Sequence, residues 1–207
     1  MKTIKETCYK GCNIRIGNEK RDLINKMIKV LIEHGFQEIS LPIINYREYF
    51  KGKVGIENTS MMFSVKDNSD RDLVLAPEYT AIMMELAKTT FKYEKNVKLF
   101  YIQECFRGEK PQKGRYRQFT QLGVEILNPS EKYFDIQGYI NLCIKLLNVD
   151  GFMDFRDFVV NREVTRGLDY YKEGKGFEIK NNEGLQLCGG GEYSGGIGFA
   201  LGADRLI

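Results

Sequence analysis

The sequence is short of the residues on which many enzymes depend. It contains one histidine, His34, and no tryptophan among its 207 residues. A single imidazole leaves histidine-based catalysis and clusters of metal-ligating side chains poorly supported. The chain also has no apolar run near the roughly 20 residues that a membrane-spanning helix needs, and no signal-like segment follows Met1. We therefore expect a soluble protein that contacts no membrane and uses no side chains as metal ligands.

Charge and cysteine content are modest too. Lysine and arginine number 31 against 28 aspartate and glutamate residues, so the formal net charge is only +3 and nucleic-acid affinity does not follow from it. The five cysteines are odd in number and scattered, a pattern typical of reduced thiols in the cytosol. The length suits one sizeable core. We expect a cytoplasmic protein with a single domain, residues 1–207.

Hydrophobic periodicity predicts a mixture of helices and strands. The predicted helices cover residues 19–34, begin near Pro77, and follow a cap at Ser130. The predicted strands cover residues 36–44, a hairpin within 61–80, 96–106 and 116–126, with short glycine-rich strands after Asp154. This order favours an α+β domain built around a largely antiparallel sheet.

The densest cluster of charge lies in CFRGEKPQKGRYRQFTQLGVEI, residues 105–126. Five cations stand close together there: Arg107, Lys110, Lys113, Arg115 and Arg117. Pro111 and Gly114 bend the loop that carries most of them, and phosphates are the anions that would neutralise it. The pattern indicates a polyphosphate site, and a solvated cationic hairpin is the alternative.

The strand that follows this loop has two different faces. With a side-chain period of two, one face is mostly apolar and the other carries Arg117, Phe119, Gln121, Gly123 and Glu125. This second face is a poor core but a suitable floor for a nucleotide and an amino-acid-sized ligand. The preceding strand and loop offer similar side chains at one parity: Tyr101, Gln103, Arg107 and Glu109.

Two further stretches combine glycine with polar side chains. TRGLDYYKEGKGFEI, residues 165–179, offers a cation, an acid and two phenols, namely Arg166, Asp169, Tyr170 and Tyr171. An ordinary tyrosine-rich hairpin is the alternative. In CGGGEYSGGIGFALGADRLI, residues 188–207, Gly198 and Gly202 leave room above a strand for a flat ligand, and Arg205 can stack on an adenine. A flexible tail is the alternative for that stretch.

These stretches, in this order, resemble the catalytic core of class II aminoacyl-tRNA synthetases, and specifically the histidyl-tRNA synthetase family. FRGE and GRYRQF, which end at Phe119, are similar to motif 2, RGLDYY to the histidine-specific motif, and GFALGADRL to motif 3. The helix over residues 19–34, the next strand and Pro42 resemble motif 1 more loosely. The similarity covers nearly the whole chain and implies a class II synthetase-like antiparallel sheet flanked by helices.

The resemblance also implies roles for individual residues. ATP would be bound by Arg107 at the α-phosphate, Glu109 at the adenine amino group, Arg115 at the outer phosphates, and Phe119 and Arg205 on either side of the adenine. Histidine would be bound by Glu78, Thr80, Gln121, Glu125, Arg166, Tyr170 and Tyr171, with Glu125 and Tyr171 on the imidazole. Arg107 and Arg166 would be catalytic, while Mg²⁺ bridges the phosphates of ATP and pyrophosphate leaves.

The sequence also departs from this family. About forty residues separate Glu125 from Arg166 and the chain stops two residues after Arg205. We therefore expect neither the family's insertion domain nor its anticodon-binding domain. Three positions differ from the usual residue: Ala76 replaces an arginine, Asp204 a glutamate and Glu192 an arginine.

A second branch of the family fits some of these departures. It is the regulatory subunit of ATP phosphoribosyltransferase, which senses histidine, has no ligase activity and would take that enzyme's catalytic subunit as its partner. Because the matched ATP-binding residues are all present, we favour ATP-dependent activation of histidine, as a histidine–tRNA ligase does in protein biosynthesis, and leave tRNA open as the acceptor. We also expect a homodimer, since motif 1 presents several apolar side chains: Ile24, Met27, Ile28, Leu31, Ile39 and Leu41.

Overall fold

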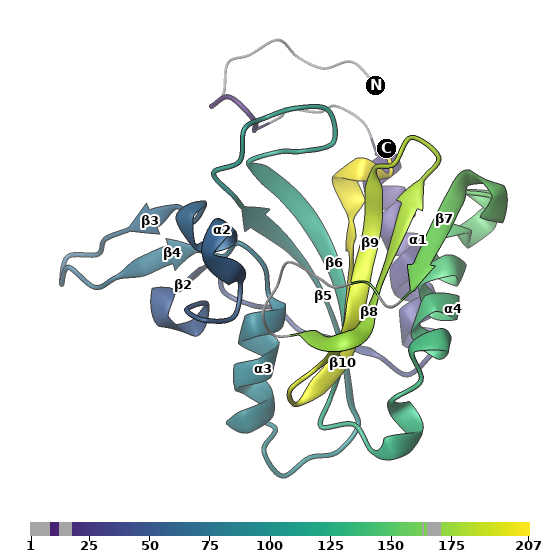
Figure 1. Ribbon diagram of the computed structural model, residues 1–207, viewed down its shortest axis with the longest axis horizontal. Coiled ribbons are helices and arrows are strands. Elements are labelled where there is room, and N and C mark those ends of the chain that lie inside the picture. The colour runs from purple at the N-terminus through teal and green to yellow at the C-terminus, as the bar shows by residue number, and fades with distance from the viewer. Residues whose placement is uncertain (1–8, 13–17, 163, 165–170) are drawn as a thin grey trace.

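The computed structural model describes residues 9–12, 18–162, 164 and 171–207 of the chain. Its centre is a seven-stranded sheet (Figure 1). In order across the sheet, the strands are β1 (Gln37–Glu38), β5 (Val97–Phe106), β6 (Gln118–Leu127), β10 (Gly196–Gly202), β9 (Gln186–Tyr193), β8 (Tyr171–Asn181) and β7 (Phe158–Arg162). Neighbouring strands are antiparallel except for β1 and β5, which are parallel. The expected α+β fold is confirmed.

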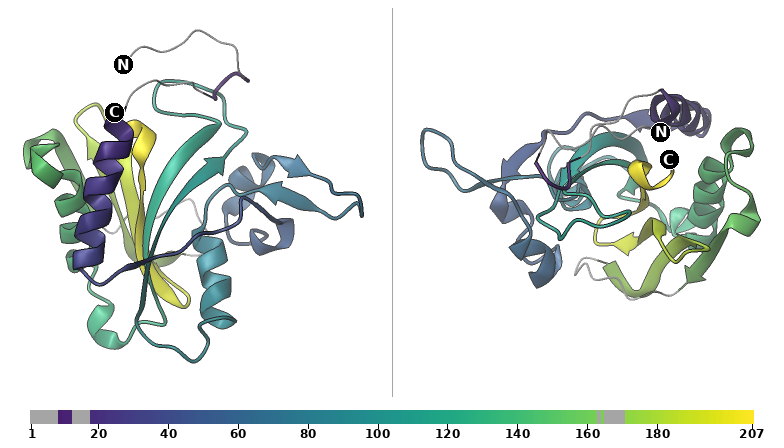
Figure 2. Two further views of the ribbon diagram at one scale, coloured as in Figure 1. Left: turned by 180° about the vertical axis from the view of Figure 1, so that it is seen from behind. Right: turned by 90° about the horizontal axis from the view of Figure 1, so that it is seen from above.

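Helices pack on both faces of this sheet (Figure 2). α1 (Glu19–Glu33) and α4 (Ile136–Leu147) bury their apolar sides in one core cluster with alternate residues of the strands. α3 (Thr80–Lys88) packs against the opposite face and contributes to a second cluster. The sheet therefore separates two cores, and the face that carries α3 is the one that holds the polar side chains described below.

A small three-stranded sheet projects beyond α3 (Figure 1). Its strands, in spatial order, are β2 (Ile44–Tyr46), β4 (Leu73–Leu75) and β3 (Ser64–Val65). The same part of the chain includes the 3-10 helix η1 (Arg47–Tyr49) and α2 (Gly55–Ser60). The other 3-10 helices are η2 (Glu131–Tyr133), η3 (Val149–Gly151), η4 (Phe155–Asp157) and η5 (Ala203–Arg205).

The two faces of β6 are those expected from its alternation. Leu122, Val124 and Ile126 belong to the cluster formed with α1 and α4, whereas Phe119 and Leu127 contribute to the cluster on the α3 side. Between Phe119 and Leu127, every second residue points to the same side of the strand. Gln121, Gly123 and Glu125 therefore lie on the α3 side as well. The prediction of a polar, ligand-sized surface along this strand is consistent with that arrangement.

Several predicted boundaries were wrong. The strand expected over residues 36–44 pairs with β5 only at β1, and the chain then crosses to β2 in the small sheet. Ser130 does not cap α4, because its hydroxyl donates to Asn96 Oδ1 at 3.0 Å and α4 begins only at Ile136. The strands after Asp154 are not all short, since β8 has 11 residues and β9 has 8.

The apolar surface on which the homodimer was predicted is also largely absent. Ile24, Met27, Leu31 and Leu41 are all buried within the chain's own cores. Their burial satisfies the apolar side of α1 without a partner. The large apolar residues that are exposed include Ile32 of α1, which is 59% exposed, and Ile44 of β2, which is 50% exposed.

Candidate functional site

The candidate site occupies the α3 face of the large sheet, where cross-strand neighbours form rows. One row runs from Glu125 of β6 through Gly198 of β10 and Gly191 of β9 to Gly176 of β8. The next row contains Tyr101 of β5, Gly123, Ala200 and Gly189. We call these two rows the glycine floor. Because residues in register on adjacent strands project to the same side, this surface has almost no side chains across β9 and β10.

Large side chains from neighbouring strands lie flat on several of these glycines. The carboxylate of Glu125 lies over Gly198, and the phenol of Tyr101 lies over Gly123. A side-chain carbon added at either glycine would overlap those groups. The expectation that Gly198 and Gly202 leave room for a flat ligand is therefore wrong, because the protein's own side chains use that space; the stem of Arg205 lies over Gly202, 3.3 Å from the position of an added carbon.

Glu125 is the central carboxylate of this face. It is 1% exposed, and its two oxygens accept hydrogen bonds from the Thr80 hydroxyl at 3.1 Å and the Tyr193 hydroxyl at 2.8 Å. Burial raises the pKa of Glu125 to about 8; the bonds from Tyr193 and Thr80 oppose this rise, and the nearby Glu78 carboxylate adds to it. Glu125 is thus a buried acid that holds its proton near neutral pH.

Glu78 organises the start of α3. Its buried carboxylate accepts the backbone N–H groups of Thr80 at 2.8 Å and of Ala81 at 2.9 Å. These are donors that the first turn of a helix leaves without intrahelical partners, and a carboxylate there also interacts favourably with the helix dipole. Glu78 therefore positions Thr80, which in turn contacts Glu125. The structure brings these three predicted residues together.

The other end of β6 gathers the groups predicted to bind ATP. The guanidinium of Arg107 lies 5.1 Å from the centre of the Phe119 ring and donates through Nε to the Pro77 carbonyl at 2.8 Å. Its Nη1 is 4.0 Å from Glu109 Oε1. Arg115 is exposed on the intervening loop. Phe119 is thus already covered by a cation.

Arg205 joins this end from η5. It donates through Nε to the Gly114 carbonyl at 2.8 Å and through Nη1 to the Gln186 carbonyl at 2.6 Å. Burial lowers the pKa of Arg205, and the positive charge of Arg107 lowers it further. Backbone carbonyls therefore hold the guanidinium groups of Arg107 and Arg205 at this end of the face.

Asp204 anchors Arg205 from the opposite side of the sheet. The Asp204 carboxylate accepts the backbone N–H of Thr120 at 2.5 Å and the ammonium of Lys20 at 3.0 Å. Lys20 also bonds the Thr120 hydroxyl. Asp204, which stands where the family usually has a glutamate, is therefore paired and only 8% exposed. Its contacts connect η5 to both β6 and α1.

Residues 9–12 lie against the loop of residues 107–117 (Figure 1). Arg117 donates its backbone N–H to the Gly11 carbonyl at 2.8 Å and its Nη1 to the Lys10 carbonyl at 3.1 Å. The same guanidinium lies 4.9 Å from the centre of the Tyr9 ring. Arg117 thus ties an early segment of the chain to the cationic loop, a role that the sequence pattern did not predict.

The remaining predicted residues divide into three groups. Arg166 and Tyr170 lie outside the described residues. Tyr171, at the start of β8, places its ring 6.5 Å from that of Tyr193 in an edge-to-face arrangement. The amide oxygen of Gln121 accepts a hydrogen bond from the Cys105 thiol at 3.0 Å.

Two further departures from the family, Glu192 and Ala76, are both buried. Glu192 pairs across the sheet with Ile197, a residue of the α1 and α4 cluster, so its side chain projects away from the glycine floor. It forms an ion pair with Lys172 at 3.5 Å. Ala76 is completely buried in the core beneath the small sheet.

The sequence pattern missed one tyrosine of this face, Tyr193, and had placed the other, Tyr101, at the same parity as Arg107 and Glu109. Tyr193 bonds Glu125, and Tyr101 covers Gly123 next to it. The signal that could have identified Tyr193 is its parity with Gly189 and Gly191 in GGGEY. Tyr101 shares a parity with Arg107 that the sequence does show, but its contact with Gly123 depends on the register of two strands.

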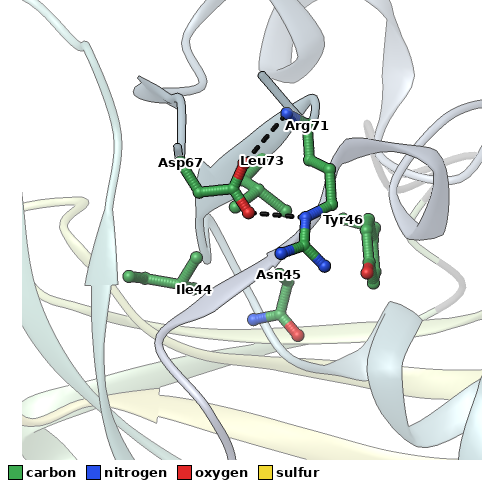
Figure 3. A pocket seen from close by; sticks show the side chains of 6 residues that line it. All are labelled: Ile44, Asn45, Tyr46, Asp67, Arg71 and Leu73. Carbon is green, nitrogen blue, oxygen red and sulfur yellow. Dashed lines mark hydrogen bonds and ion pairs between the residues drawn. The ribbon is translucent and has the colours of Figure 1, made fainter. Parts of the chain in front are cut away.

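A separate hollow lies on the small sheet (Figure 3). It is lined by Ile44, Asn45, Tyr46, Asp67, Arg71 and Leu73. Within it Arg71 and Asp67 form an ion pair at 2.5 Å, and the Arg71 backbone N–H lowers the pKa of Asp67. Because this hollow contains none of the residues on the α3 face of the large sheet, we assign no reaction to it.

Other classes of site find no support in the part of the chain that the structure describes. Among those residues, no three histidine, cysteine, aspartate or glutamate side chains come together as ligands for a metal ion. None of the described helices combines the length and apolar character that crossing a membrane requires.

Comparisons with known proteins point to one family. The family model described as Histidyl-tRNA synthetase matches residues 17–160. The histidine–tRNA ligase of Archaeoglobus fulgidus is 38% identical over 129 residues, which cover 62% of this chain and 31% of that protein. The ligase of Clostridioides difficile is 26% identical over 291 positions, covering 88% of this chain and 69% of that protein. This second comparison extends over more positions than the chain has residues, so that relative contains segments with no counterpart here.

Solved structures show the same fold. A protein from Bacillus halodurans described as an ATP phosphoribosyltransferase regulatory subunit/histidyl-tRNA synthetase has a TM-score of 0.79 and 16% identity, with 100% of this chain and 83% of that chain covered. A pyrrolysyl-tRNA synthetase from Desulfitobacterium hafniense has a TM-score of 0.71 and 19% identity, with 90% and 64% covered. Several curated relatives are much longer than this chain, which spans only 31% to 39% of their length.

Proposed function

Because the chain belongs to the histidyl-tRNA synthetase family, we propose that it binds histidine and ATP on the α3 face of the large sheet and joins them as histidyl-adenylate. One observation carries this proposal. The same strand, β6, brings a buried carboxylate to one end of the face and an arginine-covered aromatic ring to the other. The first suits a polar amino-acid side chain and the second suits a nucleotide.

The histidine subsite is centred on Glu125. An imidazole has one nitrogen that donates and one that accepts, and a carboxyl group that keeps its proton near pH 7 can serve either nitrogen. Thr80 and Tyr193 hold the carboxyl group in place, so it needs little reorganisation when a ligand binds. Glu78, Gln121 and Tyr171 complete the described part of this subsite, and Arg166 and Tyr170 are expected to join it.

The ATP subsite is centred on Phe119. Adenine would stack on this ring between Phe119 and Arg205, and Glu109 would accept from the adenine amino group. Stacking of this kind requires the Arg107 guanidinium to move away from the Phe119 ring and toward the α-phosphate, whose negative charge it would neutralise. Arg115, exposed on the loop, would contact the outer phosphates. Mg²⁺ commonly binds through substrate phosphates, which fits a site without a cluster of metal ligands among its described side chains.

The proposed reaction needs no nucleophilic side chain. A carboxylate oxygen of histidine attacks the α-phosphorus of ATP, a new O–P bond forms, and the bond to the β-phosphate breaks with release of pyrophosphate. Negative charge grows on the α-phosphate during this step. Arg107, and Arg166 by expectation, would stabilise that charge, and the sheet would hold the two substrates in line.

Two partners belong to the same proposal. Transfer of the histidyl group to tRNA would complete the reaction of a histidine–tRNA ligase. A homodimer would form through the segment that includes Ile44, because most of the apolar residues first expected at the interface are buried. Sedimentation at micromolar concentration measures this directly, and a stable monomer would contradict it.

A second candidate is a histidine-sensing regulatory subunit of ATP phosphoribosyltransferase. A specific observation favours it: backbone carbonyls already engage Arg107 and Arg205, whereas the side chains of Thr80 and Tyr193 already hold the Glu125 carboxyl group. Such a protein would bind histidine and release no pyrophosphate, and its partner would be the catalytic subunit of that enzyme.

Histidine-dependent exchange of labelled pyrophosphate into ATP tests the proposal. Arg107→Ala should slow this exchange about 10²- to 10³-fold, as expected when a group that stabilises transition-state charge is lost. Lys113→Ala is the matched control, because Lys113 is an exposed cation of the same loop that pairs with Glu183. Histidine binding without any exchange by the wild type would reject adenylate formation and favour the regulatory candidate.

A further inference from the structure

The hydroxyl group of Tyr101 is buried on the ligand face of the large sheet. The side chain is completely buried, and among the described residues the hydroxyl has no hydrogen-bond partner. A phenol buried in this way costs free energy that a phenylalanine ring would not. The ring nevertheless lies in a defined place, over Gly123, where only the missing side chain of glycine makes room for it.

The neighbouring Tyr79 shows that the fold can satisfy such a group. The rings of Tyr79 and Tyr101 are 5.3 Å apart, and both are completely buried. The Tyr79 hydroxyl, however, donates to the Glu104 carbonyl at 3.0 Å. Tyr139 also has an unpaired hydroxyl, but it belongs to the core formed with α1 and α4 on the other side of the sheet. Tyr101 is therefore distinguished by its place on the ligand face as well as by its unused hydroxyl.

The surroundings of Tyr101 include the carboxyl group most suited to a polar ligand. Gly123, which lies under the phenol, is two residues from Glu125 on the same face of β6. The carboxylate of Glu125 lies over Gly198 in the adjacent row of the glycine floor. Both of the oxygens of Glu125 are held by other residues, Thr80 and Tyr193, so Tyr101 is not needed to position it.

We propose that the Tyr101 hydroxyl contacts the side chain of the bound amino acid beside Glu125 and helps to select it; this inference rests on the proposed function. A phenol can donate one hydrogen bond and accept others. Together with Glu125 it recognises a side chain that carries both a donor and an acceptor on one compact group, as imidazole does. An apolar side chain would leave the Tyr101 hydroxyl unpaired. Tyr171, the phenol expected on the imidazole, is only partly buried, so Tyr101 takes the more selective position.

Tyr101→Phe and Tyr79→Phe form a matched pair of variants, each lacking one oxygen atom. Titration calorimetry of the full chain with L-histidine should show affinity about 5- to 20-fold weaker in Tyr101→Phe, the loss expected for one hydrogen bond in a buried site. Thermal unfolding without ligand should show a melting temperature higher by about 2 to 4 °C, since an unpaired buried hydroxyl has been removed. Tyr79→Phe should melt at a lower temperature and bind histidine as the wild type does.

The outcomes separate this inference from the proposed function. If the wild type and Tyr101→Phe bind histidine equally, Tyr101 does not contact the ligand, although the proposed function stands. A lower melting temperature of Tyr101→Phe would show that the hydroxyl is paired in the free protein and would overturn the inference as well. If the wild type binds no histidine under conditions in which it is folded, the proposed function fails and this inference fails with it.

Discussion

Histidine binding should depend on pH in a way that the Glu125 site determines. In the free protein the pKa of Glu125 is about 8, while the imidazole of free histidine has a pKa of about 6.5. The complex is expected to hold one proton between the two groups. Between about pH 6.5 and about pH 8, Glu125 of the free protein already carries this proton and the imidazole of free histidine is neutral. Binding therefore exchanges no proton with the solvent.

Outside this window, binding must exchange a proton with the solvent. Above about pH 8 Glu125 is ionised in the free protein, so binding takes up one proton. The affinity then falls about tenfold for each pH unit, so that at pH 9 it is about tenfold lower than at pH 8. Below about pH 6.5 the free imidazole is protonated and binding releases a proton, so affinity falls again. Histidine affinity is therefore expected to be highest between about pH 6.5 and 8.

Titration calorimetry in two buffers of different ionisation enthalpy measures the protons exchanged. Glu125→Gln is the control, because an amide does not titrate; any fall at high pH that persists in this variant belongs to the amino group of the ligand itself. Among the described residues, the ionisable groups that interact with Glu125 include Glu78 before α3, Tyr193 of β9, Tyr101 of β5 and Tyr139 of α4. A wild-type affinity that stays flat from pH 7 to 9, with no proton uptake at pH 9, would refute the reasoning.

Three further results are expected. The raised pKa of Glu125 favours its protonated form in the folded state, so its contribution to stability is complete below about pH 4.5. This contribution is lost as the pH rises to about 8, by up to about 1.4 kcal/mol per pH unit. Urea unfolding at a series of pH values should show this slope for the wild type but not for Glu125→Gln. Gly198→Ala places a carbon against the Glu125 carboxylate, so the melting temperature and histidine affinity should both fall. Lys20→Met leaves the Asp204 carboxylate without its cation, so the free energy of unfolding in urea should fall by about 1 to 3 kcal/mol. ATP binding should also weaken, because Asp204 holds the segment that carries Arg205. Unchanged ATP affinity would show that the contact between Lys20 and Asp204 does not position Arg205.

Local patterns predicted the part of the structure that depends on local geometry. The alternation of β6 assigned Phe119 and Glu125 to one face because the side-chain period of a strand is fixed by its backbone. The length of α1 followed from its apolar spacing and from Gly35, which has φ of +78° and ends the helix. The resemblance supplied the grouping of these residues into two subsites.

Contacts between distant strands could not be predicted in this way. Tyr193 reaches Glu125 across 68 positions of sequence, and Lys20 reaches Asp204 across 184. Both contacts depend on register and on how α1 packs, which no local pattern fixes. The same reason explains why most of the apolar side chains expected at a dimer interface are covered within the chain itself: the packing of α1 buries them.

β6 also sets a length. Glu125 lies six residues after Phe119, and at the rise of an extended strand this separates the two positions by about 20 Å. Because ten consecutive residues of β6 pair with β5, neither end of that interval can move alone. Inserting or deleting one residue between them would change the interval by a single step and also turn one of the two side chains toward the opposite face. Along this stretch the chain therefore cannot accept a change in the number of residues.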